Sequence, residues 1–216
     1  MMRAHHLQAV ELSALRVNEL VPLLNDLDSL ELRQFSYVSI HAPSEFSAAQ
    51  EPAIRDLLMS QLHRGWPIVI HPDTIHNFEL WRDFGPLLAI ENMDKRKPIG
   101  RTAQELASIF QKLPEATLCF DIGHARQVDP TMTESYLILR QFGPRLRQVH
   151  VSEVNTRSKH DVLSYASILA FQEVADLIPL EVPLILETPL IESEMQSEIE
   201  KVDSALPVEP NVAVAS

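Results

Sequence analysis

Short apolar runs recur along the 216-residue chain, and a stretch with helical periodicity follows each of them. The runs are rich in β-branched residues and lack polar alternation, which is typical of parallel strands that are buried on both faces. The sequence therefore predicts seven strands, at Gln8–Leu12, Tyr37–Ile40, Pro67–Ile70, Leu87–Ile90, Thr117–Phe120, Leu146–Val149 and Val182–Leu186.

Helix boundary signals lie in the intervals between these strands. Thr102 and Thr131 are each followed three residues later by a glutamate, which is the pattern of a capping box. Glycine or proline closes several of the helical stretches. The predicted helices run over about Asn18–Leu30, Arg55–Arg64, Thr102–Lys112, Thr131–Gly143, Ser164–Ile178 and Ile191–Leu206.

The spacing of the strand–helix units indicates how the sheet is built. The units repeat about every 29 residues, close to the minimum of about 30 for a βαβ unit, and such units close most naturally into a (β/α)8 barrel. The chain is one unit short of eight. We therefore expect an α/β fold, a TIM-type barrel of seven strands that is open between the first and the last. It would form one domain over residues 1–206, followed by a disordered tail over residues 207–216.

Six consecutive predicted strands end in aspartate, glutamate or histidine. In a parallel barrel these ends converge on the face that carries active sites. Burying several carboxylates together costs several kcal/mol for each unless a cation compensates their charge. The sequence therefore predicts a divalent metal ion, and its candidate ligands are His41, His71, Glu91, Asp121, His150 and Glu187.

The donor types bear on which metal would bind. Three carboxylates with the imidazole of His150 suit Mn²⁺, Mg²⁺ or Co²⁺, and the addition of His41 and His71 shifts the preference toward Zn²⁺. We expect Mn²⁺, Co²⁺ or Zn²⁺ as the cofactor.

The segments around these strand ends resemble the xylose isomerase-like TIM-barrel superfamily, which contains sugar and sugar-phosphate isomerases and epimerases as well as apurinic-site endonucleases. The resemblance implies a barrel, a divalent metal and an enzyme. It runs from about Val10 to Pro189, and the family's first strand has no counterpart ahead of Gln8. The matching segments are Val38–Pro43, Ile70–Pro72, Ile90–Met93, Phe120–Ala125, Val149–Ser152 and Ile185–Glu187.

In the epimerase branch, the resemblance implies one metal that holds the substrate carbonyl and the neighbouring hydroxyl and stabilises an enediolate. Glu91 and Glu187 would then remove and return the proton on opposite faces of the sugar. His124 would bind a substrate hydroxyl. The implied ligands are Glu91, Asp121, His150 and Glu187.

In the endonuclease branch, the resemblance implies three zinc ions. His41, His71 and Glu91 would hold the first, and the four ligands just named would hold the second. The third would need His124 and an Asp-x-His pair. This chain has Ser158-Lys159-His160 there, without the aspartate, so the third site is left in doubt.

Other residues near the strand ends are candidates for substrate binding. His160, Asn92 and Arg157 follow strands that carry candidate ligands, and Asn92 is adjacent to Glu91. The basic run Lys95–Lys97 could hold a substrate phosphate, although a solvated loop is the simpler interpretation. His5, His6, His63 and His76 are assigned to the surface, and Cys119 to a small buried position.

Composition narrows the classes of function. The formal net charge of −12 argues against nucleic acid as a partner, and five scattered glycines exclude Gly-rich phosphate loops. One cysteine excludes an intramolecular disulfide, and no apolar run is long enough to span a bilayer. We expect a cytoplasmic protein with a small carbohydrate substrate and no membrane partner, and a homo-oligomer remains open.

Three functions follow from these observations. The first is a metal-dependent sugar or sugar-phosphate isomerase or epimerase. The second is a zinc phosphodiesterase similar to apurinic-site endonucleases. The third is a degenerate barrel that binds a metabolite without turnover.

Overall fold

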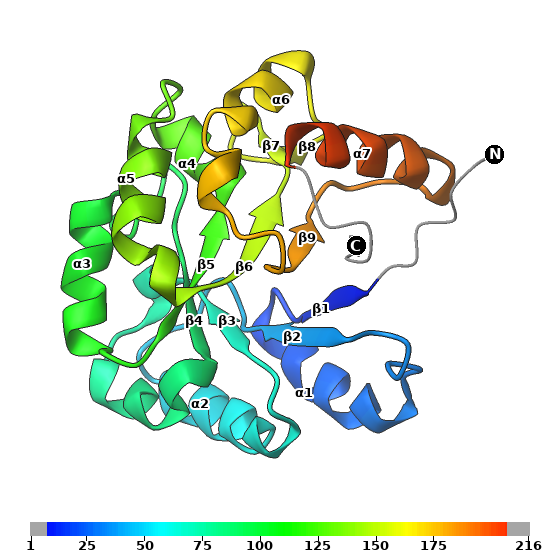
Figure 1. The fold of residues 1–216 in the computed structure, drawn as a ribbon. Coiled ribbons are helices and arrows are strands. Elements are labelled where there is room, and N and C mark those ends of the chain that lie inside the picture. Colours follow the sequence, from blue (N-terminus) through cyan, green and yellow to red (C-terminus); the bar gives the residue numbers. More distant parts are fainter. Residues whose placement is uncertain (1–7, 207–216) are drawn as a thin grey trace.

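The computed structural model describes residues 8–206, and its main feature is a sheet of seven parallel strands that curls into a nearly closed barrel (Figure 1). The order of the strands in this sheet is the same as their order along the chain. All seven predicted strands are present. They are β1 (Ala9–Ser13), β2 (Tyr37–His41), β3 (Ile68–Ile70), β4 (Leu88–Glu91), β5 (Thr117–Asp121), β6 (Leu146–Val151) and β9 (Leu184–Leu186).

Helices surround the barrel on its outside (Figure 1). Each predicted helix has a counterpart, although most are shorter than expected. The α-helices are α1 (Val17–Asp26), α2 (Glu51–Met59), α3 (Ala103–Lys112), α4 (Ile122–Val128), α5 (Thr133–Phe142), α6 (Tyr165–Gln172) and α7 (Glu192–Ala205). The 3-10 helices are η1 (Leu27–Ser29), η2 (Leu62–Arg64), η3 (Pro72–Thr74), η4 (Phe78–Leu87), η5 (Gly143–Arg145) and η6 (Ala175–Leu177). No helix within residues 8–206 is both long and apolar enough to cross a membrane.

The two predicted capping boxes have different outcomes. The Thr102 side chain caps α3 as expected and accepts a hydrogen bond from the Glu105 backbone N–H at 3.2 Å. The prediction for α5 is wrong, because Met132 is its N-cap residue, with a φ of 59°. Thr131 instead donates from its hydroxyl to the Asp129 carboxylate at 2.7 Å. A competing local acceptor therefore displaced the predicted cap.

Three further elements differ from expectation. Helix α2 begins at Glu51, four residues before the predicted Arg55, and Pro52 lies in its first turn, where proline is favoured. Helix α4 was not predicted, since it is short and follows β5 directly. A two-stranded antiparallel hairpin, β7 (Glu153–Val154) with β8 (His160–Asp161), was also not predicted. The predicted tail over residues 207–216 lies outside the described residues, and so do His5 and His6.

The strands bury side chains on both faces. Alternate residues such as Ile40, Ile90 and Phe120 are fully buried in the main hydrophobic core, which the surrounding helices share. Val69, Ala89 and Cys119 form a separate small cluster. Each of these three precedes a candidate ligand by two residues, so the cluster lies inside the barrel, one layer below the strand ends. Cys119 is buried, as predicted.

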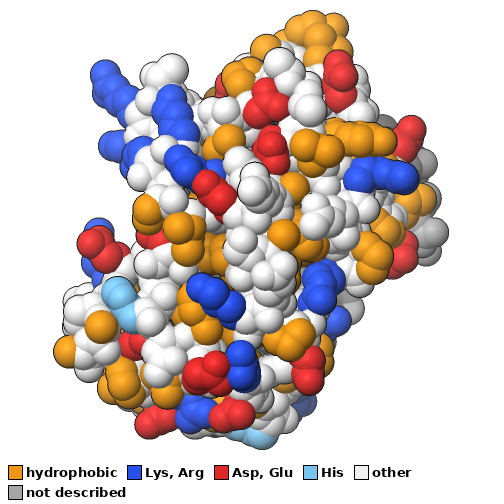
Figure 2. Space-filling view, turned by 90° about the vertical axis from the view of Figure 1, so that its left-hand side faces the viewer, with side chains coloured by type: hydrophobic (Ala, Val, Ile, Leu, Met, Phe, Trp, Pro, Cys, Tyr) orange, Lys and Arg blue, Asp and Glu red, His pale blue; other side chains and the backbone are white. Residues whose placement is uncertain are grey.

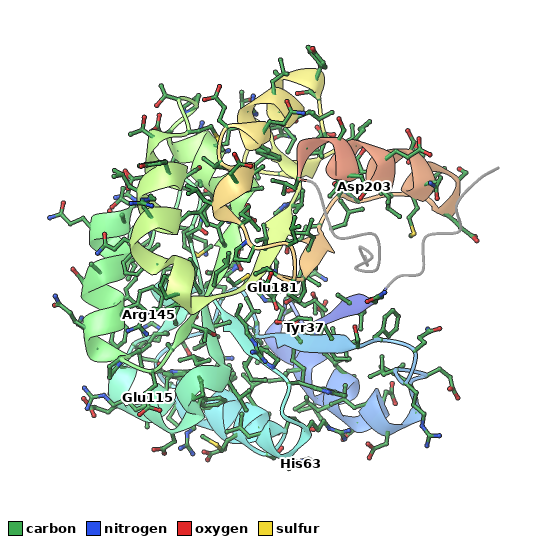
Figure 3. The ribbon with its side chains drawn as sticks, in the orientation of Figure 1. Tyr37, His63, Glu115, Arg145, Glu181 and Asp203 are labelled. Carbon is green, nitrogen blue, oxygen red and sulfur yellow. The ribbon has the colours of Figure 1, made fainter. Side chains whose placement is uncertain are left out.

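The exterior of the barrel is mixed in character. Figure 2 shows one outer face, where Lys, Arg, Asp and Glu side chains stand among scattered hydrophobic ones. His63 and His76, which the sequence assigned to the surface, are both exposed, and Figure 3 shows His63 at the periphery of the fold. The polar exterior and the apolar inner layers are what a sheet covered by helices requires.

Side chains close the barrel between β1 and β9, the two edges of the sheet. These two strands are not hydrogen-bonded neighbours within residues 8–206. Ala9 and Ile185 are buried against each other there, and Phe35 and Tyr37 pack against them. Figure 3 labels Tyr37 near this edge of the sheet. The Tyr37 hydroxyl donates to Gln148 Oε1 at 2.7 Å and so links β2 to β6. The prediction of seven strands is therefore confirmed for the described part of the chain.

Candidate metal centre

The predicted ligands all lie at the carboxyl ends of strands. His41, Glu91 and Asp121 are the last residues of β2, β4 and β5. Because the strands are parallel, these side chains meet at one face of the barrel. Four of the six predicted ligands line an open cavity of about 1350 Å³, namely His41, His71, Glu91 and Glu187. The other two, Asp121 and His150, are completely buried beside it.

The candidate ligands form three connected groups. Within each group, one ligand atom of every residue lies within 4.8 Å of the others. Glu91 belongs to two groups, and so does Asp121. The groups are His41, His71 and Glu91; Glu91, Asp121, His150 and Glu187; and Asp121, His124 and His160. The structure thus brings all six predicted metal ligands together and adds two histidines to them.

The two oxygens of Glu91 face different groups. Its Oε2 lies 3.0 Å from His41 Nε2 and 3.3 Å from His71 Nε2. Its Oε1 lies 3.2 Å from His124 Nδ1 and 3.9 Å from His150 Nδ1. A carboxylate divided in this way can bridge two cations, one on each oxygen.

Three of the six buried side-chain atoms that lack a hydrogen-bond partner in the described part of the chain belong to the central group, and His71 Nδ1 belongs to the first group. Asp121 Oδ2, His150 Nδ1 and Glu187 Oε2 are buried and have no hydrogen-bond partner within residues 8–206. Leaving a buried polar atom unsatisfied costs about 1–3 kcal/mol, and more for a charged group. All three atoms are of the kinds that bind divalent metals, and their residues belong to one group of candidate ligands. The donor set therefore fits a divalent cation, with two carboxylates and one imidazole besides Glu91.

Several ligands carry protons that a cation would displace. Burial, with repulsion from Glu187 and Glu91, raises the pKa of Asp121 to about 8 against the opposing pull of His124. Burial disfavours the charged form of His41, but its hydrogen bond to Glu91 and the nearby carboxylates outweigh this and raise its pKa to about 9. Burial opposes ionisation of Glu187 also, yet His150 lowers its pKa to about 2.

The third group lies where the sequence left a third site in doubt. His160 lies on β8, and its Nδ1 is 2.7 Å from the Ser152 hydroxyl. The rings of His160 and His124 have their centroids 5.5 Å apart. The carboxylate that the sequence lacks near Ser158 is supplied here by Asp121, from a different strand.

Two predicted substrate-binding residues lie away from the cavity. Asn92 is completely buried, and its amide pairs with the backbone of Asp121, accepting from N–H and donating to C=O, both at 2.8 Å. Asn92 therefore positions Asp121 rather than touching a substrate. Arg157 is exposed and is not among the described residues that line the cavity, because the tight turn Asn155–Lys159 directs it outward. His124 and His160 do line the cavity.

Cations line the same cavity. Arg96 and Lys97, from the basic run noted in the sequence, are among its lining residues, whereas Lys95 is not. Arg96 is held by Asp94, and Lys97 by Asp73 at 2.8 Å. Arg16 and Lys159 complete the set of four cations. Five carboxylates line the cavity with them, namely Glu11, Glu45, Glu91, Asp94 and Glu187.

Sequence reasoning missed one residue of the site. Glu11, on β1, has a buried side chain and lies 3.1 Å from His150 Nε2 through its Oε1. A signal was available, because Glu11 is the one charged residue among the five of its strand.

Sequence and structure comparisons differ in what they find. No protein-family model matches the chain, and no curated protein sequence matches it. AsbF from Bacillus anthracis, assigned as a 3-DHS dehydratase of petrobactin synthesis, aligns with a TM-score of 0.55 at 14% identity, over 91% of this chain and 88% of that one. CutC from Streptococcus agalactiae, assigned to copper homeostasis, aligns with a TM-score of 0.53 at 10% identity, over 93% and 96%.

The chain adopts a TIM-type α/β barrel fold. The fold expected from the resemblance is thereby confirmed. Endonuclease IV from Thermus thermophilus also aligns, with a TM-score of 0.46 at 18% identity, over 92% of this chain and 99% of that one. Likeness at these identities shows the fold and leaves the reaction to be argued from the site.

Proposed function

We propose that this protein is a metal-dependent hydrolase of phosphate esters, whose centre holds two divalent cations bridged by Glu91. One observation carries the proposal: Glu91 presents Oε2 to His41 and His71 and Oε1 toward His150. A glutamate held by two histidines on one side is suited to bridging cations. It is poorly suited to the proton transfer that an epimerase would require of it.

Different residues of the site would bind the metals and transfer the protons in such a reaction. When bound, two cations at these positions would polarise the phosphate ester and activate water for attack on phosphorus. Hydrolysis forms a bond from the water oxygen to phosphorus and breaks the ester P–O bond. One proton must leave the water and one must reach the departing oxygen. His124 and His160 line the cavity and are the groups placed to exchange these protons.

The first test is metal content and turnover together. Protein saturated with Zn²⁺ or Mn²⁺ is expected to hold at least two ions per chain and to hydrolyse p-nitrophenyl phosphate or its bis ester. A chelator should abolish the activity, and the metal should restore it. A single ion per chain would contradict the bridged centre. Two ions without turnover of either ester would favour the non-catalytic barrel.

Removal of the histidines that face Glu91 Oε2 tests the bridge. His41→Ala and His71→Ala are each expected to lower the metal content by one ion per chain and to reduce hydrolysis at least about 100-fold, while the central group keeps its ion. His63→Ala is the matched control, because His63 is exposed and its ring contacts the Ser60 carbonyl far from the cavity. Inductively coupled plasma measurements and initial rates give both readouts.

A substitution in the basic run Lys95–Lys97 tests whether the cavity binds the phosphate group of the substrate. Lys97→Gln removes a cation that lines the cavity and is expected to raise KM for a phosphate ester about 10-fold with little change in kcat, the pattern of lost ground-state binding. Lys95→Gln is the control two residues away, since Lys95 does not line the cavity among the described residues. Equal KM values for the two variants would argue against a phosphate contact at Lys97.

A second candidate is the metal-dependent sugar or sugar-phosphate isomerase or epimerase. The observation that favours it is that three of the four unpartnered atoms of candidate ligands among the described residues belong to the central group, which is sufficient for one ion. This function predicts metal-dependent deuterium exchange at the carbon next to a ketose carbonyl. It also predicts that His41→Ala leaves the metal content unchanged.

A further inference from the structure

Glu11 is a buried carboxylate that the proposed reaction does not use. It lies on β1 inside the barrel, where its register partner is Ser39. Its Oε2 accepts hydrogen bonds from the Ser39 hydroxyl at 2.8 Å and from Gln148 Nε2 at 2.7 Å. Its Oε1 lies 3.1 Å from His150 Nε2. Three neighbours therefore fix this carboxylate in one orientation below the metal ligands.

Burying this group is costly for the fold. The Glu11 side chain is 3% exposed, and in the described part of the chain its ion-pair partner is His150 alone. No arginine or lysine of that part compensates its charge by an ion pair. Removing a carboxylate from water costs several kcal/mol, which its partners must offset, and an apolar residue would pack at this position without that cost. The carboxylate is therefore best explained by its contact with His150.

The two nitrogens of His150 face in opposite directions. Nδ1 faces the carboxylates of the central group, 3.2 Å from Glu187 Oε1 and 3.9 Å from Glu91 Oε1, and makes no hydrogen bond within residues 8–206. A ring that binds a metal through Nδ1 must carry its proton on Nε2, and that N–H needs an acceptor. Gln148 Nε2 lies 2.7 Å from the same nitrogen but is itself a donor. The Glu11 carboxylate is the acceptor.

From this geometry we infer that Glu11 is a positioning residue for the metal centre. By accepting the Nε2–H of His150, it fixes the ring orientation and leaves Nδ1 free to bind a cation. This inference rests on the proposed function only in requiring that the central group binds a metal. Outer carboxylates that orient a ligating histidine are typically worth 10- to 100-fold in metal affinity.

The test compares two substitutions of Glu11. Glu11→Ala removes the acceptor and is expected to weaken metal binding at the central group about 10- to 100-fold. Glu11→Gln keeps an acceptor oxygen and is expected to recover part of that loss. Binding of Zn²⁺ is followed by competition with a chromophoric chelator. The ¹⁵N spectrum of His150 in the Zn²⁺-loaded wild type should show the Nε2–H tautomer.

A matched control separates this role from a structural one. Glu51 is another buried carboxylate, but it contacts Trp81 Nε1 and backbone N–H groups outside the barrel interior. Glu51→Gln should leave the affinity for Zn²⁺ unchanged. Two results would overturn the inference: wild-type affinity in Glu11→Ala, or equal weakening at both metal positions together with a lower melting temperature of the metal-free protein. If the wild type itself binds no metal, the proposed function fails instead.

Discussion

Glu91→Gln is expected to remove both bound metals and to lower phosphate-ester hydrolysis by well over about 100-fold, beyond the loss typical of a group that only supports a ligand. Each oxygen of Glu91 faces a different ligand group. An amide offers one weak neutral oxygen and a nitrogen that cannot bind a cation. Both positions should therefore lose a ligand in a single substitution, and no other predicted ligand has this effect on both.

The control for this experiment lies in the same cavity. Glu45 lines it, is exposed and belongs to none of the ligand groups found within residues 8–206, so Glu45→Gln changes the same charge without touching a ligand. Metal content, hydrolysis and the melting temperature with and without Zn²⁺ are measured for both variants. Wild-type metal content in Glu91→Gln would refute the bridged centre. A loss of only one ion would show that Glu91 serves a single position.

The strands and the six ligands could be predicted because one physical fact connects them. Parallel strands buried on both faces produce continuous apolar runs, and their carboxyl ends share one face of the barrel. A polar residue directly after such a run must therefore lie near the others. His41, His71 and Glu91 follow this rule, and the structure places their ligand atoms within 4.8 Å of one another.

The remaining parts of the site depend on contacts that sequence spacing does not encode. Glu11 lies in the middle of β1 and acts from the layer below the ligands, so a rule based on strand ends passes over it. The pairing of Asp121 with His160 depends on the β7–β8 hairpin, which positions a histidine 39 residues away along the chain. Asn92 is adjacent to Glu91 in the sequence, as a substrate-binding residue could be, but its amide donates a hydrogen bond to the backbone carbonyl of Asp121.

The helix boundaries show the same limit on a smaller scale. Thr102 caps its helix by accepting the Glu105 N–H. Thr131 has the same sequence signature, yet the Asp129 carboxylate accepts the Glu134 N–H at 3.0 Å in its place and binds the Thr131 hydroxyl as well. A capping box indicates where a helix can start, and local side-chain competition decides whether it does.

Raising the pH from 6 to 8 is expected to tighten metal binding at the central group by at least about 50-fold. The pKa of Asp121 is raised to about 8 by burial and by the carboxylates around it, so at pH 6 this ligand is protonated in the metal-free protein. A cation must displace that proton, which costs a factor of ten in affinity for each pH unit below the pKa. Protonation of a ligand therefore weakens binding at low pH.

A similar pH dependence of metal affinity is expected at the second metal position, where His41 is a candidate ligand. Its pKa is raised to about 9, because its hydrogen bond to Glu91 and the nearby carboxylates outweigh the effect of burial, so it too must lose a proton before it binds a cation. Chelator competition at pH 6, 7 and 8 measures both affinities, and proton release in weak buffer counts the displaced protons.

Burial disfavours the charged form of His150, but the nearby carboxylates of Glu187 and Glu11 help to raise its pKa above the usual value. Asp121→Asn should therefore weaken the pH dependence of the central group without removing it, and leave that of the His41 position steep. Affinities that stay level across this range would mean that the ligands are already deprotonated before the metal arrives.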